Sequence, residues 1–200
     1  MRHSEISQRP NRHDSSGTSK LVTARQHLMQ SEMADKFRIR FATVEDAEVI
    51  SWHRARMFQD MGELPANLFE AFRASSRDQL RDLLVRGRYV GWLLSLENAP
   101  NKIIAGAGVH LRRVLPHPVK NAVTFADGRH GVIVNVFTEP EWRRKGLAAI
   151  LLKQIIDWAR DEKLDRLLLH ASANGRALYE RLGFIATNEM RFAGNPPPRT

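Results

Sequence analysis

The apolar positions of this chain change period on either side of a proline, Pro140. Residues 132–138 form an almost unbroken apolar run rich in β-branched side chains, which predicts a buried strand. Pro140 ends that strand because proline has no N–H to donate to a neighbouring strand. From Leu147 onward the apolar side chains recur at helical spacing, at Leu147, Leu151, Ile155 and Trp158. The segment is therefore predicted to form a strand, a tight basic turn and a helix.

Shorter apolar patterns predict the other strands. Phe37, Ile39 and Phe41 alternate with basic residues, as expected of a half-buried strand. Residues 166–172 are predicted to form a second buried strand, parallel to residues 132–138 because a helix joins the two. Further strands are expected at residues 89–96, 103–114, 184–185 and 187–192, with a hairpin turn at 97–102.

Polar capping signals mark the helices. Thr43 is predicted to begin a helix, with Asp46 at the reciprocal position of a capping box. A second helical stretch is expected at residues 68–85, and a short helix at 176–182 that Gly183 ends in the left-handed conformation. Helices and strands are thus interspersed, and the sequence predicts an α/β fold built on a mixed sheet.

The turn before Leu147 has the chemistry of an anion site. A helix N-terminus presents backbone N–H groups without partners, and its dipole favours negative charge. Gly146 removes a side chain where a bulky anion must approach, and small Ala148 keeps the first helical turn clear. Arg143, Arg144 and Lys145 add positive charge nearby. The predicted ligand of this turn is a phosphate group.

Two motifs give the chain a resemblance to a known family. The run Arg143-x-x-Gly146-x-Ala148 resembles the [Gln/Arg]-x-x-Gly-x-[Gly/Ala] motif of the GCN5-related N-acetyltransferases (GNAT), whose turn holds the pyrophosphate of acetyl-coenzyme A. Residues 174–184 resemble the family's closing pattern, Asn-x-x-Ala-x-x-Leu/Tyr-x-x-x-Gly-Phe, through Asn174, Ala177, Leu178, Tyr179, Glu180, Leu182, Gly183 and Phe184.

The resemblance implies a fold and a cofactor site. The implied sheet is mostly antiparallel, flanked by helices, with one parallel strand pair that splays apart. Pantetheine would then pair with the exposed backbone near Val136 and Thr138, and an N–H near Val136 or Phe137 would stabilise the oxyanion. The cofactor-binding residues implied are Val136, Phe137, Thr138, Arg143, Arg144, Lys145, Gly146, Leu147, Ala148 and Asn174.

The activity implied is acetyl transfer from acetyl-coenzyme A to a primary amine of a small molecule, an amino acid or a protein. A neutral amine would attack the thioester directly. Tyr179 is the candidate catalytic residue, a general acid for the departing thiolate. The general base stays open between Glu139, Glu97, His110 and a water relay. His170 lies on an apolar strand and is expected to be a core histidine.

In the family, the first two helices and their link form the lid over the acceptor. Asp60, Glu63 and Glu70 could therefore face an acceptor amine, although a solvated helix face is the simpler interpretation. The choice of acceptor is expected to depend on the loops at residues 60–65 and 115–129, which carry no transferable signature.

Composition narrows the chemistry. The chain contains no cysteine, which excludes disulfides, a thiolate metal site and an acyl-cysteine intermediate. Its eight histidines form no His-x-x-x-His pair, so no metal is expected. The net charge of +9 raises nucleic-acid binding as an alternative, but five of the basic residues lie in residues 1–30 and three in the motif turn, which argues against it.

The ends of the chain differ from its middle. Residues 1–35 are expected to form a disordered basic arm, residues 36–194 the N-acetyltransferase domain and residues 195–200 a loose tail. No apolar run could span a bilayer and the N-terminus lacks an apolar secretory segment, so we expect a cytoplasmic protein without a membrane partner. The resemblance allows a homodimer. A non-catalytic coenzyme A-binding regulatory module of the same fold is the other interpretation.

Overall fold

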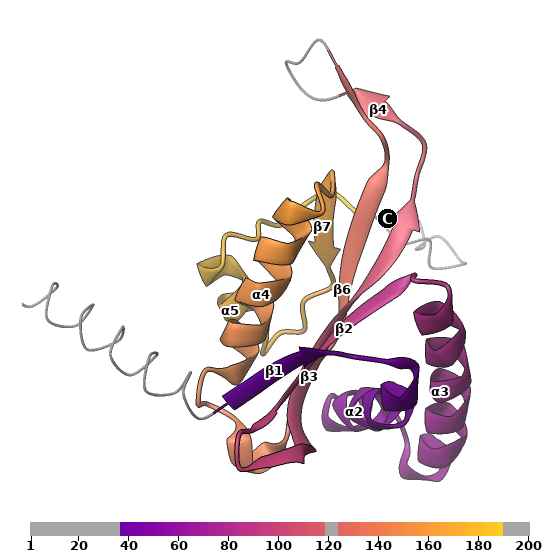
Figure 1. Ribbon diagram of the computed structural model, residues 1–200, viewed down its shortest axis with the longest axis vertical. Helices are drawn as coiled ribbons and strands as arrows, with labels where there is room; N and C mark the ends of the chain where they lie inside the picture. Colours follow the sequence, from indigo (N-terminus) through magenta and orange to yellow (C-terminus); the bar gives the residue numbers. More distant parts are fainter. Residues whose placement is uncertain (1–36, 119–123, 190–200) are drawn as a thin grey trace, which may run out of the picture.

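Five strands form the central sheet of the structure, a computed structural model that describes residues 37–118 and 124–189. The strand order is β1-β2-β3-β6-β7 (Figure 1). The bounds are β1 (Phe37–Phe41), β2 (Tyr89–Leu96), β3 (Ala99–Arg113), β6 (Arg129–Thr138) and β7 (Arg166–Leu169). Neighbouring strands are antiparallel except β6 and β7, which run parallel. This mixed sheet confirms the predicted fold class.

Helices cover both faces of the sheet. The helix α4 (Leu147–Asp161) lies on one face, and α2 (Ala47–Asp60) and α3 (Phe69–Val85) lie on the other (Figure 1). Shorter helices complete the chain: η1 (Val44–Asp46), η2 (Ala66–Leu68), η3 (Pro140–Trp142) and α5 (Arg176–Arg181). Within the two described ranges, no helix is both long and apolar enough to cross a membrane.

The alternation of side chains along β2 explains the two layers. Trp92 and Leu94 pack into a core cluster with α4 residues that include Leu151 and Ile155. Leu93, between them, packs instead with residues of α2 and α3 such as Ile50 and Leu80. Successive side chains of a strand point to opposite faces, so one apolar strand serves both cores.

The predicted helix starts are seen in the structure. The Thr43 N–H donates to the Asp46 carboxylate at 2.8 Å, which is the reciprocal half of the predicted capping box. Arg40 donates to both oxygens of the same carboxylate at 2.7 Å, and this guanidinium is the main reason that the pKa of Asp46 is lowered. On α4, Leu147, Leu151, Leu152 and Ile155 are at most 1% exposed, which confirms the predicted apolar face.

Three sheet predictions differ from the structure. The hairpin turn is shorter than predicted because β3 already begins at Ala99. The predicted strand at residues 166–172 ends at Leu169, and the Ser172 carbonyl instead accepts hydrogen bonds from the Gly175 and Arg176 N–H groups before α5. The predicted strand at residues 184–185 is wrong, because the Phe184 N–H donates to the Tyr179 carbonyl at the end of α5.

Other predictions fall partly or wholly outside the described residues. The expected strand at 187–192 shows no regular structure as far as residue 189, and the remainder is not described. The arm at residues 1–35 and the tail at 195–200 also lie outside. A two-stranded hairpin of β4 (His117–Pro118) and β5 (Phe125–Ala126) was not predicted, because its prolines indicate a loop.

Candidate functional site

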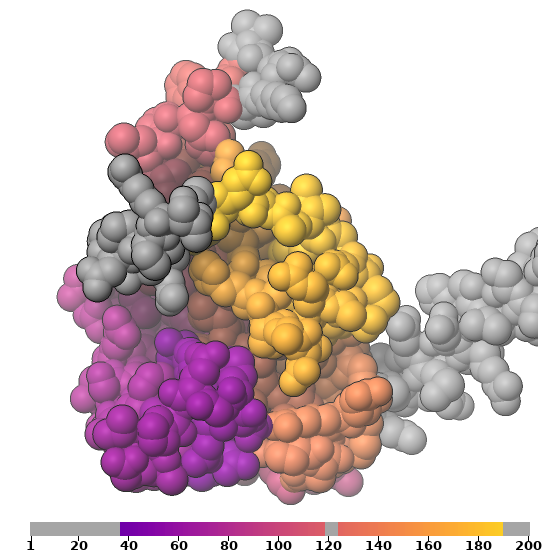
Figure 2. All heavy atoms as spheres, turned by 180° about the vertical axis from the view of Figure 1, so that it is seen from behind, coloured from indigo at the N-terminus to yellow at the C-terminus, as the bar shows by residue number. Residues whose placement is uncertain are grey.

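A cleft of about 530 Å³ opens where β6 and β7 separate. Figure 2 shows a hollow between the helices near the N-terminal end of the described chain and the gold C-terminal segment. One wall comes from α2, the floor from β6, and the other wall from residues 170–179. The cleft brings together six of the predicted site residues: Val136, Phe137, Thr138, Arg143, Asn174 and Tyr179.

The edge of β6 is open along the cleft. Pairing between β6 and β7 ends at Ile133 and Leu169, whereas β6 continues to Thr138 with β3 on its other side. In the described part of the chain, residues 134–138 therefore have no strand on the β7 side. An open edge of this kind can pair with an extended ligand through backbone hydrogen bonds. The predicted splaying of the two strands is thus seen directly.

A β-bulge begins this open edge. Gly108 of β3 pairs with Val134, and Gly106 pairs with Phe137, so Ala107 faces two residues of β6. One of these two is Asn135, whose φ of 57° lies in the left-handed region that asparagine tolerates. Sequence reasoning missed this bulge.

Two side-chain hydrogen bonds of Asn135 hold the bulge in place. Its amide nitrogen donates to the Tyr89 hydroxyl at 3.2 Å, and its amide oxygen accepts from Arg54 at 2.7 Å. Tyr89 is buried, with 4% of its surface exposed, and burial raises its pKa to about 12. These three side chains connect β2, β6 and α2 in one polar network.

The turn before α4 leaves its amides unused. The N–H groups of residues 144–149 donate no hydrogen bond within the described ranges, and the first amide with a partner is Ile150, which donates to the Gly146 carbonyl at 3.1 Å. Gly146 has φ 81°, and a Cβ placed there would meet nothing within 4 Å. Glycine is therefore favoured here by the backbone conformation, and the space beside it is open.

The basic side chains of the turn are used differently from one another. Arg143 donates to the Thr138 carbonyl at 3.0 Å, pairs with the Asp60 carboxylate and stacks over Phe137. Its charge therefore already has a partner, and it ties the end of β6 to α2. The ammonium of Lys145 lies 4.3 Å from the centre of the Trp142 ring. Arg144 is exposed and, with φ 63°, turns the chain toward the helix.

Tyr179 reaches the cleft from α5. It is half-buried, and desolvation raises the pKa of its hydroxyl, so the phenol is protonated at neutral pH. Its hydroxyl has no hydrogen-bond partner in the described part of the chain, which leaves the O–H available to a ligand. Asn174 lies in the turn that precedes α5 and also lines the cleft.

None of the predicted base candidates Glu97, His110 and Glu139 lines the cleft itself. Glu139 directly follows Thr138, and His110 lines a cavity of about 100 Å³ that shares Arg54 and Asn135 with the cleft. Glu139 also lies 3.6 Å from the Nε2 of a buried histidine, His53, and burial raises the pKa of Glu139 and lowers that of His53 to about 4. Sequence reasoning missed His53, although its spacing after Ile50 on a helix indicated the buried face.

Other predicted polar residues are now located. Asp60 and Glu63 line the cleft, as the lid interpretation expected, whereas Glu70 pairs with Arg73 and does not. The prediction of a core position for His170 is wrong. Its side chain is 72% exposed and lies 3.9 Å from Glu189, because β7 ends one residue earlier and His170 leaves the sheet at the cleft.

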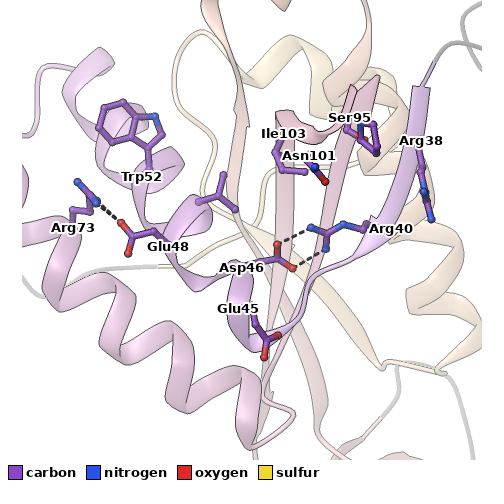
Figure 3. A pocket seen from close by; sticks show the side chains of 12 residues that line it. Arg38, Arg40, Glu45, Asp46, Glu48, Trp52, Arg73, Ser95, Asn101 and Ile103 are labelled. Atoms are coloured by element: carbon purple, nitrogen blue, oxygen red, sulfur yellow. Dashed lines mark hydrogen bonds and ion pairs between the residues drawn. The ribbon is translucent and has the colours of Figure 1, made fainter. Parts of the chain in front are cut away.

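A larger hollow, of about 760 Å³, lies beside β1, α2 and α3 (Figure 3). It contains none of the predicted site residues. Four of its charged side chains are paired, since Arg40 pairs with Asp46 and Arg73 pairs with Glu48. Within the described residues no cluster of metal-ligating side chains occurs.

A comparison with protein-family models identifies the family of this chain. The model of the acetyltransferase (GNAT) family matches residues 48–184, from the first turn of α2 to the end of the closing motif. The chain belongs to the GNAT family. Among proteins with curated functions, none matches it.

Solved structures of other acetyltransferases share this fold. A GCN5-related N-acetyltransferase from Ralstonia eutropha is 28% identical, with a TM-score of 0.67 over 78% of this chain and 97% of its own. A predicted acetyltransferase from Clostridium acetobutylicum, solved with acetyl-CoA, is 26% identical, with a TM-score of 0.65 over 78% and 94%. Glucosamine-6-phosphate N-acetyltransferase from Arabidopsis thaliana, at 17% identity and a TM-score of 0.55 over 80% and 97%, shares the fold alone.

Proposed function

We propose that this GNAT protein is an acetyl-coenzyme A-dependent N-acetyltransferase that transfers the acetyl group directly to a primary amine. The observation that carries the proposal is the continuity of unused backbone groups. The open β6 edge at residues 134–138 leads to the unpartnered amides of residues 144–149. Tyr179 reaches the same cleft from the opposite wall.

The cosubstrate would be held mainly by backbone. Its pyrophosphate fits the amides at the N-terminus of α4, where the helix dipole also favours an anion. Its pantetheine arm fits the open edge of β6 as an added strand, with Asn174 on the facing wall. Arg143 contributes by shaping this path, because its guanidinium is already paired with Asp60.

The reaction needs no covalent enzyme intermediate. The amine nitrogen forms a bond to the thioester carbon while the carbonyl oxygen becomes an oxyanion, which the N–H of Val136 would stabilise, because the pairing of Phe137 with Gly106 directs the Phe137 N–H toward β3. The carbon–sulfur bond then breaks, and the protonated hydroxyl of Tyr179 donates its proton to the thiolate. The proton lost by the amine passes to water or to a carboxylate that lines the cleft, such as Glu63.

Calorimetry and turnover test the proposal together. Coenzyme A should bind with measurable heat, and acetyl-coenzyme A should release free thiol only when an amine is added. Heat without thiol release across a broad amine panel would identify a binding module in place of an enzyme. Absence of heat with coenzyme A would contradict the account as a whole.

A further inference from the structure

Arg54 is a half-buried arginine of α2 that lines the cleft. Its guanidinium carbon lies 4.9 Å from the centre of the Phe58 ring and 5.7 Å from that of Phe72. One of its N–H groups donates to the Asn135 amide oxygen at 2.7 Å. Two aromatic rings and an amide therefore hold the guanidinium in a fixed place, which lowers the entropy lost when a ligand binds.

This guanidinium has no carboxylate partner among the described residues. Other arginines near the helices do have one: Arg143 pairs with Asp60, Arg73 with Glu48 and Arg40 with Asp46. Burial lowers the pKa of Arg54, yet arginine stays charged in proteins. A partly desolvated positive charge without a counterion is costly, and such a charge is usually matched by an anion.

The remaining donors of Arg54 are accessible. Arginine carries five N–H donors, and none of its nitrogens is among the fully buried atoms without a partner. Arg54 borders both the cleft and an adjoining cavity of about 100 Å³, and Val134 and Asn135 line both. Arg54 therefore borders space in which a ligand can bind.

Arg54 lies close to the proposed site of acetyl transfer. Asn135, its hydrogen-bond partner, directly precedes Val136, whose amide is a proposed oxyanion donor. An anion held by Arg54 thus lies beside the bulge at which the amine must attack.

We propose that the acceptor is a small primary amine that also carries an anionic group, a carboxylate or a phosphate, and that Arg54 binds this group in the fork geometry that arginine offers to such anions. This inference rests on the proposed function and names the substrate class of the same cleft. It makes Arg54 a specificity-determining residue and assigns it no role in proton transfer.

Matched pairs of acceptors test the inference without any mutation. Thiol release from acetyl-coenzyme A is compared for glycine against glycinamide, 3-aminopropionate against 3-aminopropionamide, and 2-aminoethyl phosphate against ethanolamine. The anionic member of at least one pair should have a kcat/KM about 10- to 100-fold higher, as expected for a hydrogen bond to a charged group. The carboxylate and phosphate pairs distinguish the two anions. Equal rates within every pair would overturn the inference and leave the proposed function standing.

Two variants then test whether Arg54 causes the preference for anionic acceptors. Arg54→Gln should bring the ratio within the preferred pair close to one, mainly by raising KM for the anionic member. Arg81→Gln removes the same charge from an exposed position on α3 outside the cleft and should keep the ratio of the unmodified protein. A ratio that survives in Arg54→Gln would contradict the assignment to Arg54.

A binding measurement separates the two proposals. If no amine releases thiol, the proposed function fails, and the anion site is tested alone by the melting temperature of the coenzyme A complex. A rise in Tm with the anionic amines that Arg54→Gln abolishes would support the site. No rise, or the same rise in both proteins, would overturn it.

Discussion

The two halves of β6 both carry apolar side chains, but they have different neighbours. Residues 130–133 pair with β7 on one side and β3 on the other, so their backbone groups are satisfied within the sheet. Residues 134–138 begin with a bulge, keep only β3 and face a cleft. The closed half serves the core and the open half is left for a ligand. The difference arises from two breaks in regularity, the positive φ of Asn135 and the early end of β7.

The largest expected effect is a loss of kcat on substitution of Tyr179, which lies on the cleft wall opposite residues 134–138. Tyr179→Phe removes the proposed proton donor while keeping the ring that packs against Phe184. The value of kcat should fall about 10²-fold or more, since general acid catalysis typically contributes at least that much. Pre-steady-state thiol release checks this. Unchanged kcat would remove Tyr179 from the mechanism, and coenzyme A binding measured in parallel serves as the folding control.

His53, which packs against Phe137 in the open half of β6, should make the stability of the fold depend on pH. His53 stacks on Phe137, with ring centres 4.9 Å apart, and its folded pKa of about 4 lies below the ordinary 6.5. The unfolded chain therefore binds this proton more readily, so stability should fall as the pH falls from about 6.5 to about 4, by about 3 kcal/mol at most. The raised pKa of Glu139 acts in the opposite direction.

Urea unfolding at pH 7 and pH 4.5 measures this loss. His53→Leu should flatten the difference between the two pH values, which isolates the contribution of His53 from that of Glu139. An equally steep loss in the variant would assign the effect to other groups.

The bulge itself can be weakened. Asn135→Ala leaves the Tyr89 hydroxyl and Arg54 without their partner and places alanine in the left-handed region. The free energy of unfolding should fall by about 1–3 kcal/mol. Asn101→Ala, an exposed asparagine at the start of β3, is the matched control and should change little. Equal effects in both variants would mean that the network does not support the bulge.

A smaller effect is expected at the phosphate turn. Gly146→Val strains a position with φ 81° and should weaken coenzyme A binding about tenfold, because a β-branched residue costs roughly 1–2 kcal/mol in this conformation. Gly87→Val introduces the same kind of strain, at φ 61° with open space around it, far along the chain from the turn. Calorimetry should show weaker binding only for Gly146→Val. Equal losses would reflect general strain.

The smallest effect should come from a side chain on the open half. If backbone holds the pantetheine arm, Val136→Ala should change the Kd for acetyl-coenzyme A by less than about threefold. Val132→Ala, in the closed half, should leave the Kd alone and lower stability, because Val132 is 4% exposed and part of the core. A large loss of affinity in Val136→Ala alone would show that side-chain contacts dominate.

The sequence predicted what depends on local chemistry. The β-branched run, Pro140 and the glycine turn specify a strand, a stop and a helix start, and the structure shows all three. The fold class and the parallel pair followed from this order of elements, whereas the six predicted site residues that line the cleft came from the motifs of the family resemblance. Gly183, with φ 91°, ends α5 as predicted.

The rest depends on contacts between distant segments. An asparagine within an apolar strand does not reveal that Ala107 faces two residues, because this register is set by β3. His53 and Glu139 are far apart in the sequence and come close only in the folded chain. Arg54 likewise contacts residues of two helices and of β6 that its sequence position does not indicate. His170 was misplaced because the apolar run before it gave no sign that pairing ends at Leu169.

Amide hydrogen exchange with and without acetyl-coenzyme A tests the division of β6 most directly. Bound acetyl-coenzyme A should slow exchange at residues 144–149 and at those amides of residues 134–138 that point away from β3, while residues 130–133, already bonded within the sheet, should change little. Slowing that is absent from the first two segments, or equal along the whole of β6, would contradict the account.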